Sequence, residues 1–264
     1  MIPKIIHQSA PKNKKYWNPL WEKCQRSWRK NFSKREFKYI LWSDDDNYDL
    51  VKNYYPQYLK LYTSFPYDIF RIDFCRFLYL HRYGGIYADM DMYCYRNFYS
   101  TLSDNIFLVE SFHPKELVQN SLMISPENNE FWTICLEKIL DYAIENNFNW
   151  KIPKFLDSNC SKNEDYQEFY DKIRNLVMTT TGPTFLSRQY AIYKDNLKIK
   201  KLQFSLFNPS DVDCYNYIEN PIDNFNKVNS TKDSNIYTRH FVSNTWGVDY
   251  MKIKKVINDS ILKS

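Results

Sequence analysis

Glycine is scarce in this chain. The 264 residues include only Gly84, Gly85, Gly182 and Gly247, whereas an average usage of about 7% would give roughly 18 glycines. Where a composition suppresses glycine, those that are present tend to hold backbone positions that no larger residue tolerates. We therefore expect these four positions to mark tight turns or close backbone approaches.

Apolar runs long enough to cross a bilayer are also missing, since none approaches about 18 residues. No secretory signal is visible at the start, because Pro3 and Lys4 interrupt a very short apolar stretch. The six cysteines lie far apart and form no C-x-x-C pair, which argues against a zinc site or a disulfide framework and favours a reducing compartment. We therefore expect a cytoplasmic or intracellular protein without a transmembrane segment.

The net charge is modest at +5, and we interpret the basic residues as scattered along the chain rather than clustered. Such a distribution favours an ordinary solvated surface, with the attraction of an anionic substrate as the alternative. A nucleic-acid-binding protein would need a basic patch interleaved with aromatic residues. Nucleic acid is therefore not an expected partner.

Apolar runs and helical periodicity alternate along the chain. The runs predict strands at 2–8, 37–46 (ending in an acidic loop), 86–93, 105–111, 121–125, 198–207 and 235–242. The periodicity predicts helices at 15–30, 48–62 with a break at Pro56, 70–83 and 127–145, and another opened by Pro183. This alternation indicates an α/β sandwich.

No linker divides the chain, so we expect one domain over residues 1–264. Residues 146–171 are polar and irregular, which predicts a surface insertion. Residues 251–264 form a basic amphipathic pattern that predicts a terminal helix. This helix would dock as a cap, with peripheral membrane or partner contact as the alternative.

The stretch "GGIYADMDM", residues 84–92, brings two of the four glycines next to two aspartates. Gly84 is expected to end the preceding helix in a left-handed conformation. If residues 86–91 are extended, the side chains of Asp89 and Asp91 point to the same side of the strand. Two such carboxylates repel one another unless a cation joins them, and Mg²⁺ or Mn²⁺ would fit. A bare D-x-D is a weak signal, however, and an exposed acidic turn is the plain alternative.

The surrounding residues make this signal more specific. The block "RIDFCRFLYLHRYGGIYADMD" strongly resembles the signature of glycosyltransferase family 32, which is shared by the glycosyltransferase domains of large clostridial toxins and by yeast initiating α-1,6-mannosyltransferase-like proteins. Within it, the spacing to the glycines selects Asp73 and Arg76 over the earlier pair Asp68 and Arg71. Ile72 stands where the family commonly has Ser or Ala. Further blocks that resemble the family are "IPKIIHQ", "YILWSDDD", "NSLMISPENNEFW", "TTTGP" and "RHFVSNTWG".

The resemblance implies a GT-A (Rossmann-like) nucleotide-sugar transferase fold, with a mixed central sheet flanked by helices. It implies catalytic roles for Asp73, Arg76, Asp89 and Asp91, and a Mn²⁺ or Mg²⁺ ion held by Asp91, Asp89 and His240. The residues expected to bind the donor are His7, Gln8, Asp73, Arg76, Tyr87, Asp89, Asn120, Ser121 and Trp246. For each of these residues the alternative is a purely structural role, such as a core position, a helix ion pair or an exposed acidic turn. Trp42 is expected in the core, and His81 and His113 on helices or the surface. Residues 243–247 are expected to close over the site.

The function that follows is a metal-dependent retaining glycosyltransferase, a hexosyltransferase of glycan biosynthesis. Its donor would be a UDP- or GDP-sugar, and its acceptor a hydroxyl on a glycan, lipid or protein. A metal-dependent phosphoesterase or nucleotide-sugar hydrolase also uses paired carboxylates and is one alternative. A nucleic-acid-binding protein and a catalytically inactive, binding-only relative are the others.

Overall fold

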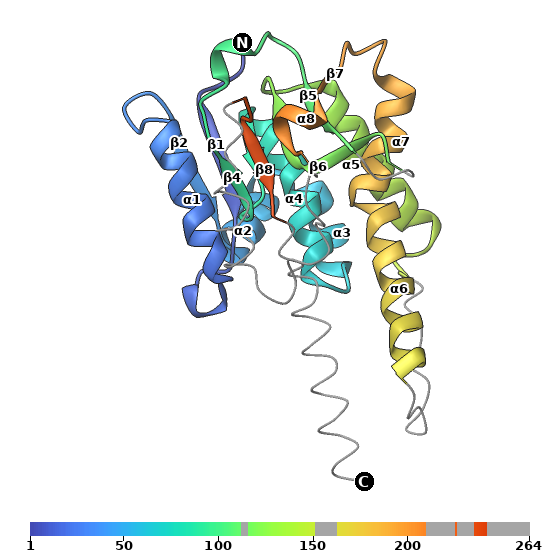
Figure 1. The fold of residues 1–264 in the computed structure, drawn as a ribbon. Helices are drawn as coiled ribbons and strands as arrows, with labels where there is room; N and C mark the ends of the chain where they lie inside the picture. Colours follow the sequence, from blue (N-terminus) through green and yellow to red (C-terminus); the bar gives the residue numbers. More distant parts are fainter. Residues whose placement is uncertain (112–115, 151–162, 210–224, 226–234, 242–264) are drawn as a thin grey trace.

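The computed structural model describes residues 1–111, 116–150, 163–209, 225 and 235–241 (Figure 1). A six-stranded sheet in the order β2-β1-β3-β6-β5-β7 forms its centre. The strands are β1 (Ile5–Ser9), β2 (Lys38–Trp42), β3 (Gly85–Ala88), β5 (Phe107–Glu110), β6 (Val118–Ser125) and β7 (Lys200–Leu202). A separate two-stranded ladder pairs β4 (Met92–Cys94) with β8 (Thr238–His240) in antiparallel fashion.

The central sheet is mixed. β1 pairs in parallel with both β2 and β3, and β5 pairs in parallel with β7. β6 is antiparallel to both of its neighbours, β3 and β5. The mixed α/β architecture expected from the sequence is therefore confirmed.

Helices cover both faces of the sheet, and the side chains of β3, β5 and β6 alternate between two apolar clusters. In β3, Ile86 and Ala88 belong to one cluster and Tyr87 to the other. The first cluster includes Trp28 of α1 (Pro19–Asn31), and the second packs against α4 (Asp68–Tyr83) and α5 (Glu130–Glu145). This period-two alternation is what a sheet buried on both faces requires.

The remaining helices complete the two outer layers. They are α2 (Asp44–Tyr54), α3 (Leu59–Ser64), α6 (Asn163–Thr180), α7 (Pro183–Tyr193) and α8 (Phe204–Phe207), with 3₁₀ turns η1 (Lys14–Tyr16), η2 (Pro56–Tyr58) and η3 (Tyr99–Thr101). None of the helices in the described part of the chain combines the length and apolar character needed to cross a membrane.

Three local expectations are wrong. The acidic residues after the second strand form the first turn of α2, because Ser43 and Asp46 make a reciprocal capping box there. Residues 163–170, expected to be irregular, begin α6. The run 198–207 divides into the short strand β7 and the helix α8. Residues 243–247 and 251–264, together with His113 and Trp246, lie outside the described residues.

Gly84 and Gly85 hold positions that a side chain could not occupy. Gly84 caps α4 with φ 58° and ψ −157°, a positive-φ region available to glycine rather than the left-handed helical geometry expected. Gly85 has φ 94°, and a Cβ there would lie 2.5 Å from the carbonyl oxygen of Ile5. The two glycines thus let the chain turn sharply from α4 into the centre of the sheet beside β1.

Candidate functional site

The two aspartates of the D-x-D stretch lie on a tight turn between β3 and β4. The Met92 N–H donates to the carbonyl of Asp89 at 3.0 Å, which closes the turn. The expectation of one continuous extended segment is therefore wrong. The turn links the central sheet to the two-stranded ladder, since Asp89 N–H donates to Ser121 of β6 and Asp91 carbonyl accepts from Phe241, just past β8.

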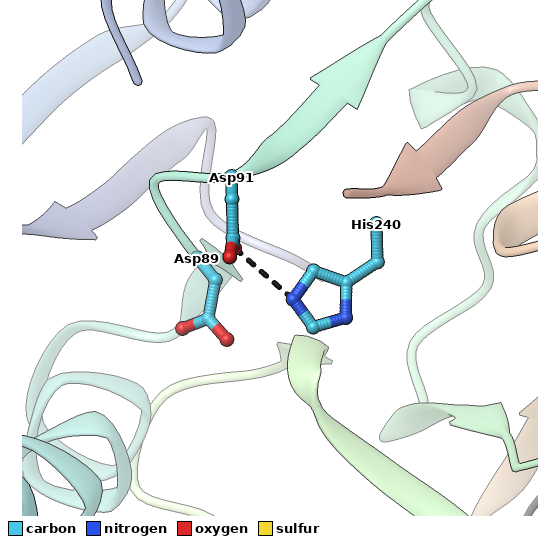
Figure 2. Close-up of side chains that lie close together, drawn as sticks. All are labelled: Asp89, Asp91 and His240. Carbon is cyan, nitrogen blue, oxygen red and sulfur yellow. Dashed lines mark ion pairs between the residues drawn. The ribbon is translucent and has the colours of Figure 1, made fainter. Parts of the chain in front are cut away.

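His240 adds a third side chain that could bind a metal ion beside this turn. Its Nε2 lies 3.0 Å from Oδ1 of Asp91, as Figure 2 shows. The pairing of β4 with β8 places it there, because Met92 and His240 are direct partners in the ladder. One ligand atom from each of Asp89, Asp91 and His240 lies within 4.8 Å of the other two, and the three side chains are buried or half-buried. Such a set of oxygen and nitrogen donors could hold a divalent cation.

The electrostatics of the three groups agree with a cation site. Burial raises the pKa of Asp89, and repulsion from Asp91 adds to this effect although Arg76 opposes it. Burial alone would lower the pKa of His240, but the neighbouring Asp91 carboxylate raises it overall. A divalent cation would relieve the carboxylate repulsion, and it would compete with protons for the imidazole.

A buried ion-pair network adjoins the turn. Arg76 Nη2 lies 3.1 Å from Asp73 Oδ1 and 3.2 Å from Asp89 Oδ1. Arg76 Nη1 donates to the carbonyl of Asn120 at 3.2 Å, and the Asn120 amide donates to Asp73. Thr181 also donates to Asp73, at 3.4 Å. Arg76 thus joins its own helix α4 to the D-x-D turn and to β6, while its Nε has no hydrogen-bond partner among the described residues.

Burial raises the pKa of Asp73 to about 7, although Arg76 acts in the opposite direction. The neighbouring carboxylates raise the pKa of Arg76 in spite of its burial. The competing pair Asp68 and Arg71 lies on the surface, where the Asp68 side chain is 68% exposed. The structure therefore brings Asp73 and Arg76, rather than the earlier pair, to the D-x-D turn.

Gln8 and Tyr87 hold Asp89 in place. Tyr87 donates its hydroxyl to Asp89 Oδ1 at 2.6 Å, and the Gln8 amide donates to the Asp89 carbonyl at 3.0 Å. The Tyr39 hydroxyl donates to Oε1 of the same Gln8 amide. Gln8 and Tyr87 are buried. In this structure they position the turn and do not present a surface to a ligand.

His7 lies in the core, not in an open base pocket. Its Nδ1 accepts from the indole N–H of Trp42 at 3.1 Å, which leaves Nε2 to donate to the Gly84 carbonyl at 2.8 Å. Burial lowers the pKa of His7 to about 4, so the ring is neutral near pH 7. Trp42 is a core residue, as expected, and it stacks on Tyr79. Both ring nitrogens of His7 are thus used within the chain.

Gln119 and Asn208 also support the site, although no sequence motif singled them out. Asn208 Oδ1 accepts from the His240 backbone N–H at 3.0 Å, and its amide donates to Gln119 Oε1 at 2.9 Å. Ser121, expected to face the sugar, donates instead to Gln119 Oε1. Asn120 and Ser121 both lie on β6 and are buried. No local pattern marks Asn208, because its partners are distant in the sequence.

Residues 18–112 match the family described as "Glycosyltransferase sugar-binding region containing DXD motif". The chain is 30% identical over 196 residues to mannosyl phosphorylinositol ceramide synthase SUR1 of Saccharomyces cerevisiae, an alignment that covers 74% of this chain and 43% of that protein. It is 27% identical over 197 residues to inositol phosphoceramide mannosyltransferase 1 of Schizosaccharomyces pombe, covering 73% and 52%. The chain thus matches about half the length of these relatives.

Among solved structures, the chain is similar to the PaToxG glycosyltransferase. The TM-score is 0.49 and the identity 15%, and the superposition covers 74% of this chain and 70% of that one.

Proposed function

Since this chain belongs to the glycosyltransferases whose sugar-binding region contains a DXD motif, we propose that it transfers a sugar from a nucleoside-diphosphate sugar to an acceptor hydroxyl. One observation carries the proposal. Asp89, Asp91 and His240 converge within 4.8 Å beside the buried Asp73–Arg76 pair. Carboxylate ligands next to a fixed guanidinium suit a diphosphate leaving group.

Asp89, Asp91 and His240 would hold a divalent ion, with Mn²⁺ favoured over Mg²⁺ because Mg²⁺ prefers oxygen ligands alone. The ion would supply Lewis-acid stabilisation of the charge on the departing diphosphate. Arg76 is held by Asp73 and Asp89, and its buried Nε has no hydrogen-bond partner among the described residues. We propose that Arg76 contacts the donor and that Asp73 fixes its orientation. Donor contact by Asn120 and by Trp246 stays a prediction.

The relatives suggest the first substrates to test. One is named a mannosyl phosphorylinositol ceramide synthase and the other an inositol phosphoceramide mannosyltransferase. We therefore propose mannose as the sugar and an inositol-phosphate lipid as the acceptor. Retention of the anomeric configuration is also part of the proposal, and NMR of the product would establish it.

The central test is Asp91→Asn. The release of nucleoside diphosphate from the donor should fall by about 100-fold or more, because the metal would lose a charged ligand. Asp68→Asn is the matched control, since Asp68 belongs to the surface pair and should leave the rate unchanged. Full activity in the presence of EDTA would contradict the metal requirement.

The donor is identified by thermal shift with Mn²⁺ and a panel of UDP- and GDP-sugars, since only a bound donor should raise the melting temperature substantially. Transfer to an added acceptor separates the transferase from a hydrolase. If water were the only acceptor with every lipid, glycan and peptide tested, the hydrolase alternative would replace this proposal.

A further inference from the structure

The basic residues are not scattered once position is taken into account. Residues 1–40 contain 11 of the chain's 36 basic residues but only two of its 31 acidic residues, Glu22 and Glu36. We call these 11 residues the basic face; they are Lys4, Lys12, Lys14, Lys15, Lys23, Arg26, Arg29, Lys30, Lys34, Arg35 and Lys38. All are exposed except Lys23, which is half-buried. The first 40 residues therefore carry a larger positive charge than the whole chain.

Few of these basic residues pair with an acidic group in the described part of the chain. Lys14 and Arg26 share Glu22, at 3.3 and 3.2 Å. Lys4 lies 4.0 Å from Glu36, and Lys12 lies 3.5 Å from Asp45. The other seven basic residues have no acidic partner in the part of the chain that the structure describes. Most of the basic face therefore has no acidic partner among the described residues, and this positive charge would attract an anionic partner.

α1 displays its part of the basic face on the side that points away from the core. α1 buries Leu20, Cys24 and Trp28 against the rest of the protein, so its opposite side carries the charges. In Figure 1, α1 forms an outer layer beside the β2 edge of the sheet. The loops that precede and follow α1 extend the basic face beyond both of its ends. A helix of this length spans about 20 Å, so the charges are spread over an extended surface rather than one point.

The chemistry of this surface favours phosphate headgroups over nucleic-acid bases. Most aromatic side chains of the region are buried, including Trp28, Phe32 and Phe37, and Arg29 covers the ring of Tyr39 at 4.2 Å. They offer no row of exposed rings on which bases could stack. Tyr16 is the exception, being 57% exposed with Lys15 4.7 Å from its ring centre. An exposed tyrosine beside lysines is typical of a membrane–water interface.

We propose that the basic face binds the anionic surface of a lipid membrane. Trp21 of α1 packs with Met90, the residue between Asp89 and Asp91, so the bound helix would keep the D-x-D turn close to the bilayer. This geometry would give the site access to a lipid acceptor. The access to a lipid acceptor rests on the function proposed above, whereas the binding of the basic face to a membrane does not.

Vesicle co-sedimentation tests the proposal with the full chain, in the absence of donor and metal. Vesicles with about 30% phosphatidylserine should bind the protein, vesicles of phosphatidylcholine alone should not, and added salt should weaken the binding. The triple variant Lys30→Glu, Lys34→Glu, Arg35→Glu should lose about tenfold or more in partitioning. The matched control Lys52→Glu, Arg174→Glu, Arg188→Glu changes the same net charge on other exposed surfaces and should bind nearly as the parent does. Circular dichroism checks that both variants are folded.

The other outcomes are equally decisive. Equal loss in both triple variants would show a response to net charge alone and would overturn the proposal, as would failure to bind the anionic vesicles. Tighter binding to a single-stranded RNA than to these vesicles would assign the face to nucleic acid instead. Asp91→Asn should bind vesicles like the parent, so failure of the transferase proposal and failure of this one are distinguishable.

Discussion

Arg76 connects α4 to the D-x-D turn, because its guanidinium lies 3.1 Å from Asp73 and 3.2 Å from Asp89. The spacing to Gly84 and Gly85 was sufficient to identify these three residues and Asp91 from the sequence. The roles of buried side chains were not accessible in this way. Whether a histidine faces a ligand or the core depends on packing from other elements. The local sequence around a histidine at a strand end is the same in both cases.

His7 should make stability depend on pH. Its pKa is about 4 in the folded protein, against 6.5 ordinarily, because burial disfavours the charged ring. The unfolded state therefore binds the proton more readily, and stability falls as the pH drops from 6.5 towards 4. The loss amounts to about 3 kcal/mol.

Urea unfolding of the wild type and of His7→Gln at a series of pH values isolates this effect. Glutamine can still donate to Gly84 and accept from Trp42, but it does not titrate. The wild type should lose about 3 kcal/mol more than the variant between about pH 7 and about pH 4. Parallel pH profiles would show that His7 is not the group responsible. His81 is present in both proteins, so its contribution cancels.

At the scale of elements, the type of most helices and strands was predictable, but the long helix α6 and the connections at the site were not. The D-x-D segment is a turn, because β4 leaves the central sheet to pair with β8. This pairing joins residues almost 150 positions apart, and no local periodicity reports it. Asn208 and Gln119 were missed for the same reason.

Asn208 should act as a positioning residue for His240. Asn208→Ala removes the acceptor for the His240 N–H and the donor to Gln119. The Mn²⁺ concentration for half-maximal activity should rise about tenfold, whereas kcat at saturating Mn²⁺ should fall less. The free energy of unfolding should drop by about 1–3 kcal/mol. Asn196→Ala, at an exposed turn, is the control and should change neither quantity. An unchanged metal requirement in Asn208→Ala would contradict this role.

At the scale of the whole molecule, the alternation of strands and helices predicted an α/β sandwich, and the resemblance predicted the mixed sheet. The strand order was not predictable from periodicity, since period-two patterns show which residues face inward but not which strand lies alongside. The same alternation gives β3, β5 and β6 side chains in both apolar clusters, so we expect that neither cluster can be lost alone.

The two clusters should therefore unfold together. Ile124→Val on β6 and Ile139→Val on α5 each shorten one buried side chain, in different clusters. Each should cost about 0.5–1.5 kcal/mol and move a single transition to lower denaturant, with fluorescence and circular dichroism coinciding. Two separate transitions would show that the described chain contains more than one cooperative unit, against the single domain expected.

The packing of Met90 bears on how the D-x-D motif is read in other sequences. Its middle position is conventionally written as any residue. Here that residue is 4% exposed and packs with Trp21 and Ala10, so a polar or charged side chain would be buried without a partner. In chains that share this turn, the middle letter carries information about packing, and a pattern search that leaves it unrestricted discards that information. An apolar residue between the two aspartates, with a tryptophan at the corresponding place on the first helix, would be a more selective signature than the aspartates alone.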